Sequence, residues 1–268
     1  MSTAPAPALN VSATRPVPFG RTFVAEFRKS FDTRAGMWLL ITIGILVSIV
    51  ELFILIVSAV NDADAIYFSD FAFVPGAITS LLLPVVAILL VTTEWSQRSA
   101  MFTFALEPRR MRVILAKWLV AVCWAIVTLA MMIVVGVVVT AISSVLSPDA
   151  THWSGSSGNP NFLGFVIFQM LAMSTGFAIA ALLLNTPAAI VVFFLYWYLF
   201  PGILAAIGLI GDGIRNLLDW INFQDAADPM INGDMAGDDW GKLIVSVLIC
   251  IGLPLAFGIW RIMRAEVK

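Results

Sequence analysis

The lysine and arginine residues of this chain gather in three segments that alternate with long apolar stretches. The chain has six apolar stretches of membrane-spanning length, and thirteen of its fifteen Lys and Arg residues fall before the first, between the second and third, or after the sixth. Only Arg215 and Lys242 lie elsewhere. Because positive residues beside membrane spans are held on the cytoplasmic side, the pattern predicts a multi-span membrane protein with both ends in the cytoplasm.

The composition agrees with this interpretation. Hydrophobic residues make up 60% of the chain and charged residues 12%, whereas about a quarter of the residues in a soluble domain are charged. A length of 268 residues accommodates six helices of about 20 residues each. We therefore expect an all-α membrane protein whose six transmembrane helices form a domain over residues 35–260. The expected spans are residues 35–60, 71–93, 118–147, 162–184, 188–211 and 243–260.

Three segments are expected to lie outside the spans on the cytoplasmic side. Residues 1–18 are rich in Ala, Pro, Ser and Thr and lack the continuous apolar stretch of a signal peptide, so we expect a disordered tail. Residues 19–34 are predicted to form an amphipathic helix on the membrane surface, and residues 261–268 a short tail. The predicted helix carries aromatic rings at every fourth position: Phe19, Phe23, Phe27 and Phe31.

Two turns of the chain can be placed between the later spans. Residues 153–211 carry no charge and are too long for one crossing. Asn185-Thr186-Pro187 is the strongest helix breaker near their middle, which predicts a tight hairpin of spans four and five. Between spans five and six, apolar residues with helical spacing alternate with charges, which predicts a short amphipathic helix on the outer face. A Gly- and Asp-rich stretch then leads to span six.

The segment Glu94 to Lys117, between spans two and three, is the best candidate for contact with a cytoplasmic partner. It is too long for a simple turn and mixes charged with apolar residues, so it can rest on the membrane and present one face to a protein. The alternative is that its arginines anchor lipid headgroups and fix the topology. The candidate residues are Glu94, Arg98, Glu107, Pro108, Arg109, Arg110, Arg112 and Lys117.

Glu51 is the only acidic residue inside a predicted span. An ionisable residue within the membrane is a candidate functional site, because exposing it to lipid costs several kcal/mol. Glu51 either lines a substrate path, pairs with Arg215 or Lys242, or is hydrated at the outer interface.

Span five is unusually aromatic near its centre. The dense rings would suit a platform for an apolar or amphiphilic substrate, and ordinary helix packing explains them equally well. The residues are Phe193, Phe194, Tyr196, Trp197, Tyr198 and Phe200.

The chain resembles the permease subunits of ABC-2 type transporters, six-span exporters that work with a separate ATPase. In the loop between spans two and three, that family has an acidic residue, a Gly-Thr step, then Pro-x-Arg and a Lys entering span three. Glu94, Pro108, Arg110 and Lys117 match this pattern, and Ser99-Ala100 stands where Gly-Thr is common. The resemblance covers most of the chain, including an amphipathic helix before span one and helices returning into the outer leaflet between spans five and six.

The resemblance implies a division of labour between polypeptides. The loop from Glu94 to Lys117 would dock into a groove on the nucleotide-binding subunit, which would hold ATP and Mg²⁺. This chain has no GxxxxGK[ST] loop of its own, so we expect no catalytic, cofactor or metal site in it. Spans one and five would contact a second permease copy or a paralogue and border a path for a lipid, drug-like or other amphiphilic substrate across the cytoplasmic (inner) membrane.

The same residues are compatible with other functions. A secondary transporter or channel, or a non-transporting membrane scaffold, remains an alternative. An intramembrane protease is disfavoured because the sole histidine, His152, lies outside the spans. Cys123 and Cys250 sit in different spans at different depths, which favours packing over a disulfide. The basic residues are too dispersed to predict nucleic-acid binding.

Overall fold

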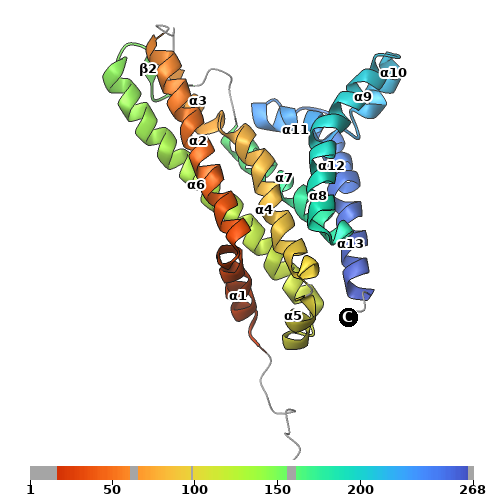
Figure 1. The fold of residues 1–268 in the computed structure, drawn as a ribbon. Helices are drawn as coiled ribbons and strands as arrows, with labels where there is room; N and C mark the ends of the chain where they lie inside the picture. Colours follow the sequence, from red (N-terminus) through yellow and green to blue (C-terminus); the bar gives the residue numbers. More distant parts are fainter. Residues whose placement is uncertain (1–16, 61–65, 98, 156–160, 265–268) are drawn as a thin grey trace, which may run out of the picture.

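The computed structural model describes residues 17–60, 66–97, 99–155 and 161–264, and these form an elongated helical bundle (Figure 1). Six helical stretches in this part of the chain are long and apolar enough to cross a membrane. This confirms the prediction of an all-α, multi-pass membrane protein. The stretches are Arg34–Val57, Phe68–Ser96, Arg110–Leu146, Phe162–Leu183, Thr186–Gly208 and Asp239–Arg264.

The first half of the bundle is built from α1 to α6. Helix α1 precedes the first spanning helix, α2, and α3 and α4 together form the second span. A short helix, α5, links α4 to the long α6. Their bounds are α1 Phe19–Asp32, α2 Arg34–Val60, α3 Phe68–Phe73, α4 Gly76–Ser96, α5 Ala100–Leu106 and α6 Arg110–Leu146.

The second half begins with α7 and ends at α13. Spans five and six are each interrupted by a π-helical segment, η2 and η3 respectively, and α10 and α11 lie between these spans. The bounds are α7 Phe162–Leu183, α8 Thr186–Phe194, η2 Leu195–Leu199, α9 Phe200–Gly208, α10 Asp212–Leu218, α11 Phe223–Asn232, α12 Asp239–Val247, η3 Leu248–Gly252 and α13 Leu253–Arg264.

Helices α1 and α5, the α7–α8 turn and the end of α13 share one end of the bundle, here called the basic end (Figure 1). At this end Arg110 Nη1 donates to the carbonyl oxygen of Ile262 at 2.6 Å, and Arg261 Nη1 donates to that of Leu182 at 2.5 Å. The loop after span two and the end of span six therefore lie on the same side of the bundle.

Helix α7 forms the centre of the bundle, where it packs against α4, α11 and α13. Small residues allow the backbones to approach closely. A Cβ atom added at Gly176 would lie 2.5 Å from the Pro84 carbonyl oxygen of α4, and one at Gly258 of α13 would lie 2.6 Å from the Ala181 carbonyl carbon. Such contacts are typical of helix packing in membranes, where small residues bring backbones together.

The predicted hairpin of spans four and five is present. Helix α7 ends at Leu183, and Leu184 adopts a left-handed conformation with φ of 53°. The side chain of Asn185 then caps α8 by accepting a hydrogen bond from the Ala188 amide at 3.0 Å, and Pro187 occupies the first turn of α8, where its missing N–H costs nothing.

The helix bounds differ from the predicted span bounds in two places. Span two is broken between α3 and α4 at Val74 and Pro75, because proline fixes its own φ and favours a helix start. Helix α6 begins at Arg110, before the predicted span of residues 118–147, and its 37 residues extend about 55 Å. Since the hydrocarbon core is about 30 Å thick, the charged first turns of α6 project beyond the apolar region.

The segment between spans five and six contains two short helices, α10 and α11, and α11 lies partly in the stretch rich in Gly and Asp. Helix α11 buries Phe223, Ala226, Ala227 and Met230, which recur with the i, i+3, i+4, i+7 spacing of one helix face. Two parallel two-residue strands, β1 Ile66–Tyr67 and β2 Thr151–His152, are a further small departure from the all-α prediction.

Candidate functional site

Helix α1 lies against the bundle rather than only beside the membrane surface. Phe23 and Phe27 of the predicted aromatic stripe pack on the core, and the Phe27 ring stacks on Trp124 of α6 with centroids 5.7 Å apart. The residues buried most deeply are polar: Thr22, Glu26 and Ser30. Glu26 therefore lies on the side of α1 that faces the bundle. The side chain of Phe31 lies outside the described part.

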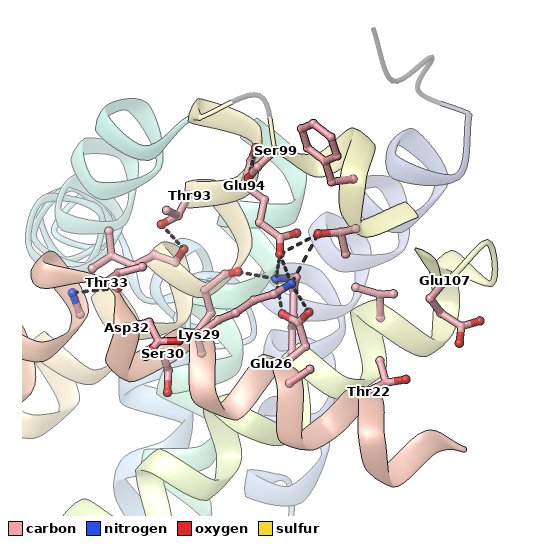
Figure 2. A pocket seen from close by; sticks show the side chains of 18 of the residues that line it. Thr22, Glu26, Lys29, Ser30, Asp32, Thr33, Thr93, Glu94, Ser99 and Glu107 are labelled. Carbon is pink, nitrogen blue, oxygen red and sulfur yellow. Dashed lines mark hydrogen bonds and ion pairs between the residues drawn. The ribbon is translucent and has the colours of Figure 1, made fainter. Parts of the chain in front are cut away.

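The polar face of α1 meets α4 and α6 in a largely buried group of charges (Figure 2). This group, here called the ionic cluster, consists of Glu26, Lys29, Glu94 and Lys117. Lys117 Nζ of α6 lies 2.6 Å from Glu26 Oε2 and 3.1 Å from Glu94 Oε1. Lys29 Nζ lies 2.7 Å from both Glu26 Oε1 and Glu94 Oε1. Two carboxylates thus alternate with two ammonium groups, and the cluster is neutral overall.

The remaining donors of both ammonium groups are also used. Lys117 Nζ donates to the carbonyl oxygen of Leu90 at 3.0 Å, and Lys29 Nζ lies 3.4 Å from Thr103 Oγ1 of α5. Thr103 Oγ1 in turn donates to Glu94 Oε1 at 3.2 Å. The cluster therefore joins α1, α4, α5 and α6 through fully satisfied lysines, which is the condition under which buried charges are tolerated.

The charge of Lys29 is stabilised by its neighbours. Burial alone would lower the pKa of its ammonium group, but the hydrogen bonds and charges of Glu26 and Glu94 outweigh burial and raise the pKa above its ordinary value. Lys29 is consequently positive throughout the physiological pH range. Lys117 is 6% exposed and Glu26 2% exposed, so neither can be rehydrated without moving α1.

The structure separates the arginines that sequence analysis grouped together. Arg110 is half-buried and bound to the bundle: besides its bond to Ile262, its guanidinium carbon lies 5.1 Å from the centroid of the Phe104 ring. Arg112 Nη1 lies 3.4 Å from Glu107 Oε2. Arg109 and Pro108 are exposed at the junction of α5 and α6. Arg98 lies outside the described residues.

Helix α5 turns an apolar surface outward. Met101 is 46% exposed, Phe102 69% and Leu106 81%, and Ala100 is its one buried residue. These residues are apolar and lie at the basic end beside Arg109. An exposed apolar patch rimmed by charge is typical of a protein or membrane contact.

Glu51 lies fully buried in α2, with 0% of its surface exposed. Neither carboxyl oxygen has a hydrogen-bond partner among the described residues, and Lys242 is 3.7 Å from Asp239 instead. The proposed pairing with Arg215 or Lys242 and the proposed hydration at the outer interface therefore do not hold. A buried polar group without a partner costs free energy, which sets Glu51 apart from the satisfied ionic cluster.

The aromatic residues of span five do not form one surface. Phe193 and Trp197 are buried with centroids 5.5 Å apart, and Gln224 Nε2 of α11 donates to the Trp197 carbonyl oxygen at 3.1 Å. Tyr198 is exposed and stacks on Phe194. The rings of Tyr196 and Phe200 stack on each other 5.6 Å apart. Packing accounts for Phe193 and Trp197, and Tyr198 faces outward.

The described residues contain no group of three or more His, Cys, Asp or Glu placed to hold a metal ion. Cys123 and Cys250 are free. No protein-family model matches the chain, and no curated protein matches its sequence.

Sequence analysis identified Glu94 and Lys117 but missed their partners Glu26 and Lys29. A signal was present, since Thr22, Glu26 and Ser30 recur every fourth residue, which places three polar groups on one helix stripe beside the aromatic one. A polar stripe on a helix next to membrane spans can either face water or contact a polar residue buried in the bundle. The identity of that partner depends on α6, ninety residues away.

Proposed function

We propose that this chain is the membrane-spanning subunit of an ABC-2 type exporter, with its basic end in the cytoplasm and α5 docked on a separate ATPase. The observation that carries the proposal is the joint position of α5 and the ionic cluster. A short helix with an exposed apolar surface is attached through Thr103 to the charges that hold α1, α4 and α6 together. A partner that moves α5 therefore acts on spans two and three at once.

Energy would come from that partner. Closure of two ATPase subunits around ATP and Mg²⁺ would push on α5, and the motion would pass to the spans as a rigid-body displacement. Two copies of this chain, or one copy and a paralogue, would enclose the path. The exposed aromatic surface of Tyr198 in span five supports an apolar or amphiphilic substrate class.

Association with an ATPase tests the proposal. The chain, purified in mild detergent from its own cells, should carry a polypeptide that contains a phosphate-binding GxxxxGK[ST] loop and hydrolyses ATP. Phe102→Glu should reduce the recovered ATPase at least tenfold, because it places a charge on the exposed surface of α5. Trp153→Glu provides the matched control, since Trp153 is also exposed, at 52%, but lies beyond β2, outside the spans and away from the basic end.

Recovery of the chain without any ATPase, or equal recovery with both variants, would contradict the proposal. Arg109→Glu extends the test. Because Arg109 is exposed, this substitution should weaken ATPase association while the protein stays in the membrane. Unchanged association would assign Arg109 to lipid anchoring. Arg110 is unsuitable for this purpose because its loss also frees the end of α13.

Glu51 favours a second candidate, an ion-coupled secondary transporter, because a buried acid without a partner is the group such carriers protonate. Transport by the chain in vesicles separates the candidates. An exporter requires ATP and the ATPase, and it continues in Glu51→Gln. A carrier works under a proton gradient without ATP, and Glu51→Gln abolishes its transport. Absence of transport under both conditions would favour a membrane scaffold.

A further inference from the structure

A cavity of about 460 Å³ lies between α4, α7, η2 and α11, away from the basic end of the bundle (Figure 1). A volume of this order suits a drug-sized molecule. Two aromatic residues line it, Phe168 of α7 and Trp197 of η2. Two acidic residues of α11, Asp225 and Asp228, line it as well. Among the described residues of the lining there is no lysine or arginine.

The two aromatic rings are inclined to each other. Phe168 is half-buried and Trp197 is buried, and their ring centroids lie 6.0 Å apart with the planes at 50°. Gln224 Nε2 of α11 donates to the Trp197 carbonyl oxygen at 3.1 Å, within the π-helical turn of span five. Such π-helical turns inside α-helices frequently occur at functional sites. The faces of aromatic rings attract cations.

The two carboxylates of the lining share one face of α11. Asp225 and Asp228 are three residues apart on this helix, so their Cβ atoms are about 5–6 Å apart. Asp225 Oδ2 accepts a hydrogen bond from Asn222 Nδ2 at 2.6 Å, and Asp228 Oδ2 accepts one from Asn232 Nδ2 at 3.0 Å. Both donors are neutral amides. In the described part of the chain, no hydrogen bond or ion pair reaches Oδ1 of either aspartate, so one cation can contact both carboxylates.

The surroundings of Asp225 are negative. Burial raises the pKa of its carboxyl group above the usual value, and the negative charges of Asp219 and Asp228 raise it further. The hydrogen bond from Asn222 and the positive charge of Arg215 lower the pKa, but they do not offset the other causes. The charge of Arg215 therefore leaves the negative charge around Asp225 incompletely compensated.

The whole segment between spans five and six has the same sign of charge. Residues 212–242 contain seven aspartates and two basic residues, Arg215 and Lys242. No basic side chain of the described residues forms an ion pair with either aspartate of the lining, and Lys242 Nζ lies 3.7 Å from Asp239 Oδ1. A cleft lined by charge of one sign concentrates ions of the opposite sign.

A metal ion is a poorer match to this lining than an organic cation. Ca²⁺ takes about six to eight oxygen ligands, whereas the described residues contain no group of three or more His, Cys, Asp or Glu placed to hold a metal ion. Alkylated ammonium ions have the opposite preference, because their alkyl groups pack on aromatic rings while the ring faces attract the charge.

We propose that this cavity binds an organic cation, an alkylated ammonium ion whose charged centre lies between Asp225 and Asp228 and against the ring of Phe168. The carboxylates neutralise the charge, and the aromatic rings replace the water around the alkyl groups. The ligand contacts α7, η2 and α11 together. This inference concerns binding by the chain itself and holds whether or not the chain exports a substrate.

Binding of a fluorescent choline analogue, 2-(dansylamino)ethyl-trimethylammonium, tests the proposal. The full chain is purified in dodecyl maltoside at pH 7, and dansyl fluorescence is titrated against empty micelles to remove non-saturable partition. We expect saturable binding that is at least tenfold tighter than for N-(3,3-dimethylbutyl)dansylamide, which has the same shape with carbon in place of the charged nitrogen. Equal affinity for the two, tighter binding of the anionic dansylglycine, or no saturable binding would overturn the proposal.

Competition separates two sources of the same ammonium chemistry. Displacement of the probe by phosphatidylcholine added to the micelles would identify a lipid headgroup as the occupant. Displacement by tetramethylammonium but not by phosphatidylcholine would identify a soluble cation. Both outcomes support the proposal, whereas displacement by phosphatidylglycerol, which lacks an ammonium group, would contradict it.

Substitutions in α11 test the charges. Asp225→Asn and Asp228→Asn each keep an oxygen that can accept the existing amide hydrogen bond, and each should weaken binding of the choline analogue at least threefold. The double variant should weaken it at least tenfold. Asp234→Asn is the matched control, because Asp234 is an exposed aspartate of the same segment outside the lining, and its affinity should match that of the unmodified chain. An equal loss in the control would show that the probe responds to the general field rather than to this cavity.

A substitution in α7 tests the aromatic contact. Phe168→Leu removes the ring and keeps an apolar side chain, and it should weaken binding of the choline analogue at least threefold. Phe162→Leu is the control, since Phe162 belongs to the same helix, is 49% exposed and lies outside the lining. Equal affinity of the two variants would contradict the contact between the cation and the Phe168 ring.

Discussion

At the scale of single residues, we expect replacement of Lys117 to destabilise the basic end most. Its ammonium group is buried and contacts Glu26, Glu94 and the Leu90 carbonyl oxygen. Breaking a buried ion pair by removing one partner costs more than the pair itself contributes, because the other charge stays buried without compensation. The same reasoning does not apply to partly exposed pairs such as that of Lys242 and Asp239.

Replacement of Lys117 by methionine should therefore lower the free energy of unfolding by about 3–5 kcal/mol, measured by denaturant titration of the purified protein in detergent. Lys242→Met is the control and should change it by less than about 1 kcal/mol. Adding Glu26→Gln to Lys117→Met should recover part of the loss, since one of the two carboxylates left without Lys117 becomes neutral. A double variant less stable than Lys117→Met would contradict the assigned pairing.

Replacement of Glu51 should have the opposite effect and stabilise the protein. Because both of its oxygens are buried without a partner among the described residues, Glu51→Leu should raise the free energy of unfolding by about 1–3 kcal/mol. The same titration measures this change. A large loss of stability in Glu51→Leu would show that the carboxyl group has a partner in the assembled protein.

The candidate site illustrates what a sequence can and cannot predict at this scale. Glu94 and Lys117 were found because the order of residues in their loop resembles a known pattern. Glu26 and Lys29 were missed because a charged residue on an amphipathic helix is compatible with water, lipid headgroups or a buried partner. Only the approach of α1 to α6, set by contacts such as Phe27 on Trp124, decides among these.

At the scale of helices, α7 determines how the others are arranged. Its glycines permit near-contact of backbones with α4 and α11, while Gly258 brings α13 close from the other side. In a membrane, helix association depends on such packing, because lipid tails are as apolar as the side chains they replace. The position of α4 on α7 in turn places Glu94 and Leu90 at the ionic cluster.

A methyl group at Gly176 should disturb this arrangement. Gly176→Ala would bring a Cβ atom to 2.5 Å from the Pro84 carbonyl oxygen and 2.6 Å from Pro84 Cβ, so the free energy of unfolding should fall by about 1–3 kcal/mol. Gly202→Ala is the matched control: nothing lies within 4 Å of its added Cβ, and the change should raise stability by up to about 1 kcal/mol. Equal effects of the two substitutions would contradict the close approach of α4 and α7.

The predicted and observed helices differ where local signals conflict. The position of α11 was not predicted, because Gly and Asp residues surround its apolar face in the sequence. The π-helical segments η2 and η3 were not predicted, since their apolar composition is the same as that of α-helical neighbours. By contrast, the α7–α8 turn was predicted well because Asn and Pro there act locally.

At the scale of the whole molecule, the number of spans was predictable because it depends on length and hydrophobicity alone. The side of the bundle on which each loop lies also follows from the number of crossings. The contacts of Arg110 with the end of α13 and of Arg261 with the end of α7 agree with this arrangement. The orientation of the bundle in the membrane is a separate prediction, and it depends on the distribution of positive charge.

Cysteine labelling in intact cells tests this predicted orientation most directly. In a background lacking Cys123 and Cys250, single cysteines replace Met101 of α5, Met263 of α13 and Trp153 beyond β2, all of which are exposed. A membrane-impermeant maleimide should label Trp153→Cys in intact cells, and Met101→Cys and Met263→Cys only after permeabilisation. Labelling of Met101→Cys and Met263→Cys from opposite sides, or of both in intact cells, would contradict a six-span protein with its basic end in the cytoplasm.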